Sequence, residues 1–194
     1  MMRNIVILNG HPDPASKGLC HALAEAYAEG ARSSGHTVRR LDIAALQFGL
    51  LHSQSEFARS ADSPAILAAQ QTLLWANHLV VIFPLWLGDM PALLKAFFEQ
   101  TLRPGFAFVD RPSGFPIGKL KGRSARIIVT MGMPAFLYRW YFLAHGLKTL
   151  ERNILRFVGI APVRSTVLGG IGQRSRESIA RALDDVKALG RRAV

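Results

Sequence analysis

Residues 79–83 read LVVIF, a run in which every side chain is apolar and three of the five are β-branched. This composition is typical of a strand that is buried on both faces, and such strands occur in parallel sheets covered by helices. Residues 91–102 then place two leucines and two phenylalanines at a helical spacing. We therefore expect a central parallel strand that is followed by a helix.

Further strands and helices alternate on both sides of this unit. Short apolar runs predict four more strands, at Asn4–Asn9 and at residues 37–43, 125–130 and 161–168. Helical spacing predicts helices at residues 19–32, 64–76, 136–157 (with a break around Gly146) and 175–189. This alternation predicts an α/β fold in one domain, residues 1–194, with a doubly wound, mostly parallel sheet of five strands and helices on both faces.

Two stretches fit neither pattern. Residues 44–63 show no regular period, and we expect irregular structure with a short turn there. Residues 103–122 are rich in Gly, Pro and aromatic residues. They are long for a simple connection, so we expect a functional insertion.

Composition and charge limit the classes of function. The chain has one cysteine, Cys20, which excludes a disulfide framework or a cysteine metal site and favours a cytoplasmic location. The longest apolar run is about half the length of a membrane span, so we expect a soluble protein. Residues 1–102 carry 7 basic and 8 acidic side chains, whereas residues 103–194 carry 17 and 5. This asymmetry fits an anionic partner or a solvated basic face, and without a nucleic-acid motif we expect no nucleic-acid partner.

Ligands of doubly wound sheets bind at the carboxyl ends of the strands, so the loops after the first, third and fourth strands are the candidate site. The first loop, residues 10–20, feeds a helix N-terminus, whose backbone N–H groups and positive dipole suit a phosphate. His11, Ser16 and Lys17 can add side-chain donors. The loop lacks the Walker and G-x-G-x-x-G patterns, and the alternative is that Ser16 simply caps the helix.

The loop after the third strand holds a tryptophan between two leucines, in the order Pro84, Leu85, Trp86, Leu87, Gly88. An apolar, aromatic wall at a strand end can pack against a flat ring system, and the glycine allows a close approach of the backbone. The alternative is that the tryptophan belongs to the core.

The loop after the fourth strand, with Thr130, Met131 and Gly132, can offer backbone donors to the edge of such a ring. It leads into a dense aromatic stretch that contains three aromatic residue types and ends near His145. A tyrosine and a histidine together at a pocket mouth are suited to hydrogen-bond a reduced ring or a quinone oxygen. A core helix or a dimer interface would also explain the aromatic stretch.

Residues 83–108 read FPLWLGDMPALLKAFFEQTLRPGFAF. This stretch resembles a Phe-Pro-Leu…Pro-Ala-x-Leu-Lys-x-(aromatic)-Phe-Glu run, followed by Gly-Phe-Ala, of the flavodoxin-like NAD(P)H:quinone oxidoreductases. That family includes mammalian quinone reductase, bacterial modulators of drug activity and the ancillary subunit of glutathione-gated potassium efflux systems. The opening strand with its Gly-His-Pro and the FVGI at residues 157–160 are also similar. The resemblance covers nearly the whole chain and implies a flavodoxin-like fold.

The resemblance implies a flavin cofactor, FMN or FAD, with NAD(P)H as co-substrate. The flavin phosphate or diphosphate would be held by His11, Ser16, Gly18, Leu19 and Cys20. The isoalloxazine would be lined by Pro84, Leu85, Trp86, Leu87 and Gly88, and its pyrimidine side by Thr130, Met131 and Gly132. In the family, hydride passes from NAD(P)H to the flavin and then to a quinone, azo dye or nitroaromatic in a ping-pong relay.

Tyr138 and His145 would be the catalytic groups near the substrate, and Tyr141 is an alternative because the Tyr138–His145 spacing is one residue longer than in the family. The family and the aromatic stretch, residues 136–142, also imply a homodimer with the site at its interface. Residues 131–134 (MGMP) replace the family's Gly-Gly pair, and Leu-Cys replaces its Phe-Asn at the first helix, so FMN and FAD both remain open.

Three other functions remain as alternatives. One is a regulatory flavoprotein that associates peripherally with a membrane transporter. Another is a non-enzymatic electron carrier, which the high net charge of +11 disfavours because flavodoxins are usually acidic. The third is a basic nucleic-acid-binding domain without a flavin.

Overall fold

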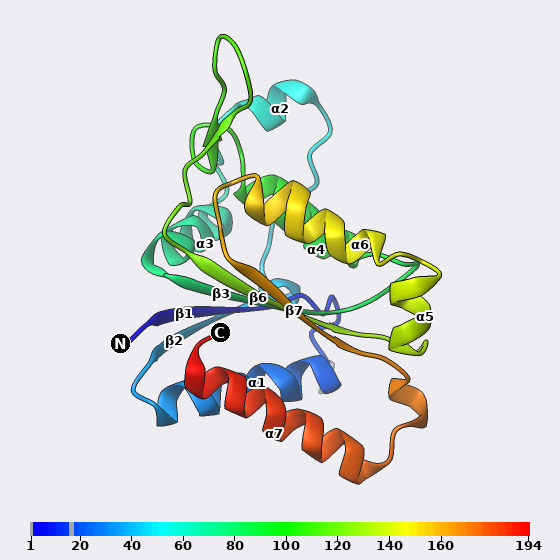
Figure 1. Cartoon of the computed structure of the whole chain (residues 1–194). Helices are drawn as coiled ribbons and strands as arrows, with labels where there is room; N and C mark the ends of the chain where they lie inside the picture. The colour runs from blue at the N-terminus through cyan, green and yellow to red at the C-terminus, as the bar shows by residue number, and fades with distance from the viewer. Residues whose placement is uncertain (1, 16–17) are drawn as a thin grey trace.

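The computed structural model describes residues 2–15 and 18–194. Five strands form one sheet in the order β2-β1-β3-β6-β7, and every neighbouring pair is parallel (Figure 1). The strands are β1 (Asn4–Asn9), β2 (Thr37–Asp42), β3 (His78–Pro84), β6 (Ser124–Thr130) and β7 (Val163–Leu168). This confirms the predicted α/β class and the doubly wound sheet.

Helices cover both faces of the sheet, as predicted. In Figure 1, α1 (Leu19–Ser33) and α7 (Arg176–Arg192) lie below the sheet. The helices above it are α3 (Pro64–Trp75), α4 (Ala92–Thr101), α6 (His145–Lys148) and η2 (Thr149–Arg156). The shorter elements are η1 (Ile43–Ala45), α2 (Gln54–Ala58), α5 (Ala135–Trp140) and η3 (Ile171–Gln173).

Alternate side chains of the strands point into two separate apolar clusters. In β1, Val6 and Leu8 belong to the cluster under α3 and α4, whereas Ile5 and Ile7 belong to the cluster over α1 and α7. The central strand β3 contributes to both clusters and is buried from its first residue to Phe83. This double burial explains why its sequence is apolar at successive positions.

The two helices below the sheet approach each other closely because both have a glycine at the contact. A Cβ on Gly30 of α1 would overlap the backbone of Lys187 in α7, and a Cβ on Gly190 would overlap the carbonyl of Tyr27 in α1. The two backbones therefore set the distance between α1 and α7, which pack side by side on the same face of the sheet.

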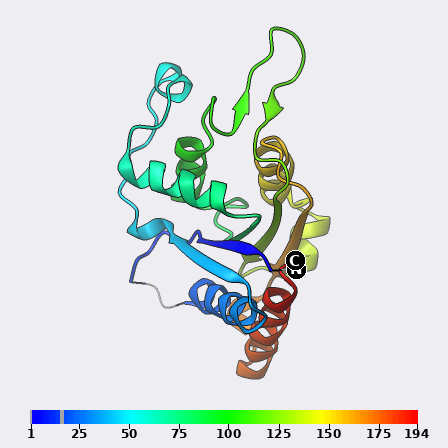
Figure 2. The ribbon, with the colours of Figure 1, turned by 90° about the vertical axis from the view of Figure 1, so that its left-hand side faces the viewer.

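The irregular stretches contain more structure than their sequences predict. Residues 103–122 include a small antiparallel hairpin, β4 (Phe108–Val109) and β5 (Ile117–Gly118), which projects from the body of the protein in both views (Figures 1 and 2). The helical break expected around Gly146 comes just before it, where Leu143 and Ala144 have φ angles of 53° and 50°.

Within the described part of the chain, no helix is both long enough and apolar enough to span a membrane.

A histidine is buried at the amino end of β3. His78 is 1% exposed, with its Nε2 atom 3.0 Å from the Tyr27 hydroxyl and its Nδ1 atom 2.7 Å from Ser124 Oγ. Burial lowers the pKa of this imidazole to about 3. Positive charge on Arg3, Arg126, His36 and Arg164 contributes to this same downward shift of the pKa.

We expect the free energy of unfolding to fall as the pH drops from about 6.5 towards 3. In this window the unfolded chain binds a proton at His78 that the folded chain excludes, which gives a slope of about 1.4 kcal/mol per pH unit. The slope, measured by urea denaturation, should be shallower in His78→Gln. His52→Gln removes an exposed histidine and should keep the original slope. An unchanged slope in His78→Gln would contradict the assignment.

Candidate functional site

Each of the three candidate loops begins with one more backbone hydrogen bond that continues the parallel ladder. The pairs are Gly10 N to Ile82 O at 2.7 Å, Leu85 N to Thr130 O at 2.8 Å, and Met131 N to Leu168 O at 2.9 Å. These bonds align the loops after β1, β3 and β6 along the carboxyl edge of the sheet.

The loops after β1 and β3 meet where the strand order reverses. The two strands are neighbours in the sheet although β2 lies between them in the chain, and crevices at such points are the usual ligand sites of these sheets. The rings of His11 and Trp86 meet edge to face, with their centroids 6.1 Å apart. The structure therefore brings together two of the predicted cofactor-binding segments.

The loop after β3 is a tight turn with an apolar tip. Trp86 and Asp89 exchange two backbone hydrogen bonds of 2.9 and 3.0 Å. The two residues between them, Leu87 and Gly88, have φ angles of 48° and 83°. Trp86 is 50% exposed and Leu87 is fully exposed, so neither is a core residue. The turn presents an apolar wall at the edge of the sheet, above the half-buried Pro84 and Leu85.

Side chains occupy the backbone donors in the first half of the β1–α1 loop. The bonds are His11 N to Asn9 Oδ1 at 3.3 Å, Asp13 N to His11 Nδ1 at 3.2 Å, and Ala15 N to Asp13 Oδ1 at 2.9 Å. The intervening Pro12 and Pro14 have no N–H group. Backbone donors for a phosphate must therefore come from the second half of the loop, and a side-chain contact from His11 stays a prediction.

That second half runs into α1. Ser16, predicted to bind phosphate, lies outside the described residues. Gly18 is the exposed N-cap, and the amides of Leu19 and Cys20 belong to the first turn, which has no acceptors within the helix. The Cys20 side chain is buried, with its Sγ atom 3.4 Å from Thr130 Oγ1. Burial raises the pKa of this thiol, so the side chain packs as a neutral group.

The loop after β6 is tied mainly to the neighbouring loop after β7. Met131 is buried, and its carbonyl accepts a hydrogen bond from Ile171 N at 3.2 Å, while its own amide continues the ladder. Thr130 is also buried. Gly132 is exposed, and no described atom lies within 4 Å of the position of a Cβ on it. Of the three predicted residues, Gly132 is thus the one whose backbone lies at the surface of the site.

Tyr138 and His145 occupy one short segment but different environments. The Tyr138 side chain is 1% exposed, and its hydroxyl accepts a hydrogen bond from Leu147 N at 3.0 Å. Burial raises the pKa of this phenol. His145 is exposed at the start of α6, while Tyr141 is exposed and packs against Phe142. The structure therefore gives Tyr138 an interior contact, and a catalytic role for it stays a prediction.

The start of α6 packs directly on the turn after β3. A Cβ on Gly146 would overlap the carbonyl oxygen of Gly88 and lie 2.8 Å from Asp89 Cα. The carboxylate of Asp89 in turn accepts a hydrogen bond from Met90 N at 2.7 Å. This contact places the residue after His145 against the turn that carries the apolar wall, and sequence analysis missed it because it joins residues far apart in the chain.

Sequence analysis also missed the polar side chains Asn9 and Asp42 at the ends of β1 and β2. Asn9 Nδ2 donates to Asp42 Oδ1 at 2.9 Å. Their signal was available, because adjacent parallel strands end at one edge, Asn9 closes a predicted strand and Asp42 is the residue before the end of another. No group of three or more His, Cys, Asp or Glu side chains in residues 2–15 and 18–194 is arranged to hold a metal ion.

Comparison with known protein families shows the family to which this chain belongs. The Flavodoxin_2 family, described as a flavodoxin-like fold, matches residues 3–189. The chain is a flavodoxin-like protein of this family. The resemblance inferred from residues 83–108 is thereby confirmed.

This flavodoxin-like protein is similar to several proteins along most of its length. It is 31% identical to Smu.1420 of Streptococcus mutans UA159, with a TM-score of 0.81 over 97% of this chain and 99% of that one. It is 24% identical over 172 residues to an uncharacterized NAD(P)H oxidoreductase of Haemophilus influenzae, covering 87% of this chain and 84% of the relative. It is 24% identical over 211 residues to NAD(P)H dehydrogenase (quinone) 1 of Rattus norvegicus, covering 96% and 76%.

If the flavodoxin-like protein binds flavin against Trp86, Trp86→Ala should lower its affinity for FMN about tenfold, or about 1.4 kcal/mol. Trp86→Phe keeps an aromatic face and should lose less. Because Trp86 is half-exposed, the melting temperature should hardly change. The measurement is a fluorescence titration of apoprotein with FMN. Leu50→Ala, which shortens another exposed apolar side chain, is the control. If Trp86→Ala and the control bind FMN with equal affinity, Trp86 does not pack against the flavin.

Proposed function

We propose that this protein is a flavin-dependent oxidoreductase that transfers hydride from NAD(P)H to a quinone or a similar flat electrophilic acceptor by a ping-pong relay. The observation that carries the proposal is the exposed apolar wall of Trp86 and Leu87, in which the Trp86 ring meets His11 of the loop that leads into α1. An aromatic wall and a phosphate-binding helix end, side by side at the strand-order reversal, suit a flavin nucleotide. Similarity to quinone oxidoreductases supports the same class.

The residues present fit a flavin with either one or two phosphates. The first-turn amides at Leu19 and Cys20 would hold a phosphate, and the residues from Pro84 to Gly88 would line the ring. Open space at Gly132 leaves room for a ring edge. When bound, the flavin supplies the acceptor and donor of hydride. FMN and FAD both suit this arrangement.

The exposed wall also explains how a flat acceptor would be selected. Trp86 and Leu87 exclude water from one side of the site and favour apolar, planar molecules. His145, exposed beside the wall, can donate a hydrogen bond through an imidazole nitrogen to an acceptor oxygen on which negative charge develops. Tyr138 supports this arrangement from the interior, since its hydroxyl holds the amide of Leu147 at the start of α6.

Rapid mixing of the flavin-loaded protein with NADPH and with NADH tests the proposal. At least one nucleotide should bleach the flavin absorbance, and a benzoquinone should then restore it, with parallel lines in double-reciprocal steady-state plots. Failure of both nucleotides to bleach a bound flavin would reject the reductase.

The same experiment tests His145. His145→Gln should slow the benzoquinone half-reaction by about 100-fold and leave the nucleotide half-reaction nearly unchanged, because an amide, unlike an imidazole, cannot pass a proton to the acceptor oxygen. His52→Gln, at another exposed histidine, is the matched control and should leave both half-reactions unchanged. If His145→Gln behaves like this control, the histidine has no catalytic role.

We also propose a homodimer with the site at its interface. The aromatic segment leaves large apolar side chains exposed next to the candidate site: Phe136 by 67%, Trp140 by 82% and Tyr141 by 76%. Soluble proteins seldom leave such a patch uncovered.

Light scattering should give a mass of about twice 21.3 kDa at micromolar concentration. Trp140→Asp should shift the protein towards the monomer, because it places a charge within the apolar patch. Leu74→Asp, on α3, is a control at another exposed leucine and should leave the mass unchanged. A monomeric wild-type protein would contradict the dimer.

A further inference from the structure

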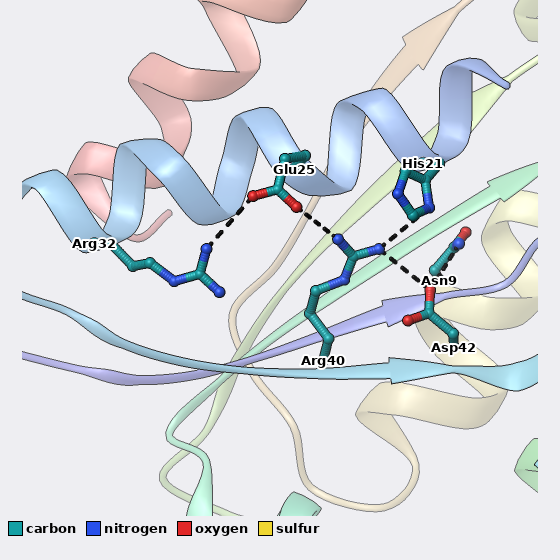
Figure 3. Close-up of polar contacts among 6 residues, drawn as sticks. All are labelled: Asn9, His21, Glu25, Arg32, Arg40 and Asp42. Atoms are coloured by element: carbon teal, nitrogen blue, oxygen red, sulfur yellow. Dashed lines mark hydrogen bonds and ion pairs between the residues drawn. The ribbon is translucent and has the colours of Figure 1, made fainter. Parts of the chain in front are cut away.

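A chain of polar contacts joins the exit of β1, the first turns of α1 and the end of β2 (Figure 3). Arg40, on β2, is at its centre. Its Nη1 atom donates to Glu25 Oε2 at 2.7 Å, and its Nη2 atom lies 3.3 Å from Asp42 Oδ1 and 3.5 Å from His21 Nδ1. Asp42 Oδ1 also accepts from Asn9 Nδ2 at 2.9 Å.

The chain of contacts reaches both ends of the β1–α1 loop. Asn9 closes β1 and, through its Oδ1 atom, accepts the amide of His11 at 3.3 Å. His21 and Glu25 lie in the first two turns of α1. Residues 10–18 are therefore spanned by a clamp whose middle, Arg40 and Asp42, lies on a different strand.

Arg40 is more buried than its partners, since the side chains of Glu25 and Asp42 are 55% and 39% exposed. The Arg40 side chain is 18% exposed, and its Nε atom is buried without a hydrogen-bond partner among the described residues. Two carboxylates, Glu25 and Asp42, balance Arg40 and the more distant Arg32. Since the charges cancel, the cluster does not itself attract a phosphate; its effect is to hold the backbone near it.

The loop needs such support because its first half is committed to internal contacts. The amide of His11 bonds to the side chain of Asn9, and the amides of Asp13 and Ala15 bond to side chains of the loop itself. The path of the backbone from Asn9 onward thus determines where the donors of the second half lie. A phosphate gains most from donors that are already oriented.

We propose that Asp42 and Arg40 are positioning residues of the β1–α1 loop, which they clamp at Asn9 and at the start of α1 so that its donors are preset for the phosphate of a flavin nucleotide. The inference rests on the proposed function for the identity of the ligand. The clamp itself concerns the loop and can be tested without a ligand.

The test compares the binding of FMN, with FAD in parallel, and of riboflavin, which has no phosphate, by fluorescence titration. Asp42→Ala removes the acceptor for Asn9 and should lower the affinity for FMN about tenfold, the equivalent of one charged hydrogen bond. Its affinity for riboflavin should stay within about twofold, because the ring wall is untouched. Asp42→Asn keeps an acceptor oxygen and should recover most of the affinity for FMN.

Arg32→Ala is the matched control. Its pair with Glu25 is long, at 3.5 Å, and more than half exposed on both sides, so such a contact contributes little. This variant should bind FMN and riboflavin like the wild-type protein. An unchanged ratio of FMN to riboflavin affinity in Asp42→Ala would overturn the proposal. So would a parallel loss of both affinities with a lower melting temperature, since that marks a purely structural residue.

Hydrogen exchange of the flavin-free protein separates the clamp from the proposed function. In Asp42→Ala the amides of His11 and Asp13 should exchange faster than in Arg32→Ala, because Asn9 is no longer held. Equal exchange rates overturn the clamp. If the wild-type protein binds no flavin, the proposed function fails, and this exchange measurement alone decides whether the clamp exists.

Discussion

The backbone hydrogen bond from Leu85 to Thr130, with its counterparts at Gly10 and Met131, is the constraint on which the candidate site depends. Each bond extends the parallel ladder one residue beyond the strands and sets the direction in which a loop leaves the sheet. Leu85, the first of these donors, directly follows the central strand β3, which is buried on both faces. Side chains of the core therefore hold the site indirectly, through the register of the sheet.

Much of the fold could be predicted because its signals are local. The runs IVIL in β1, LVVIF in β3 and IIV in β6 are apolar at successive positions, as a doubly covered strand requires. The resemblance of residues 83–108 to a known family further predicted that residues 84–88, directly after β3, line the cofactor ring. Trp86 could have been a core residue from its type alone, and its half-exposed position was settled by the structure.

The parts that could not be predicted depend on contacts between distant residues. The helical break around Gly146 was expected, but the packing of Gly146 against Gly88 and Asp89, where only a glycine fits, was not. Met131 was expected to present backbone donors, yet both of its backbone groups bond to the neighbouring strand and loop. The hydrogen bond that the Tyr138 hydroxyl accepts from the amide of Leu147 was not expected either. A single sequence carries no local signal for such pairings.

Leu87 combines two unfavourable features at one residue. It is a bulky residue with a φ angle of 48°, which costs about 1–3 kcal/mol, and its side chain is wholly exposed to water. Glycine or asparagine would adopt this backbone conformation with less strain. Laboratory evolution for thermal resistance alone would therefore tend to replace Leu87 and erase the apolar tip of the turn. Stabilised variants should therefore be checked at this position first.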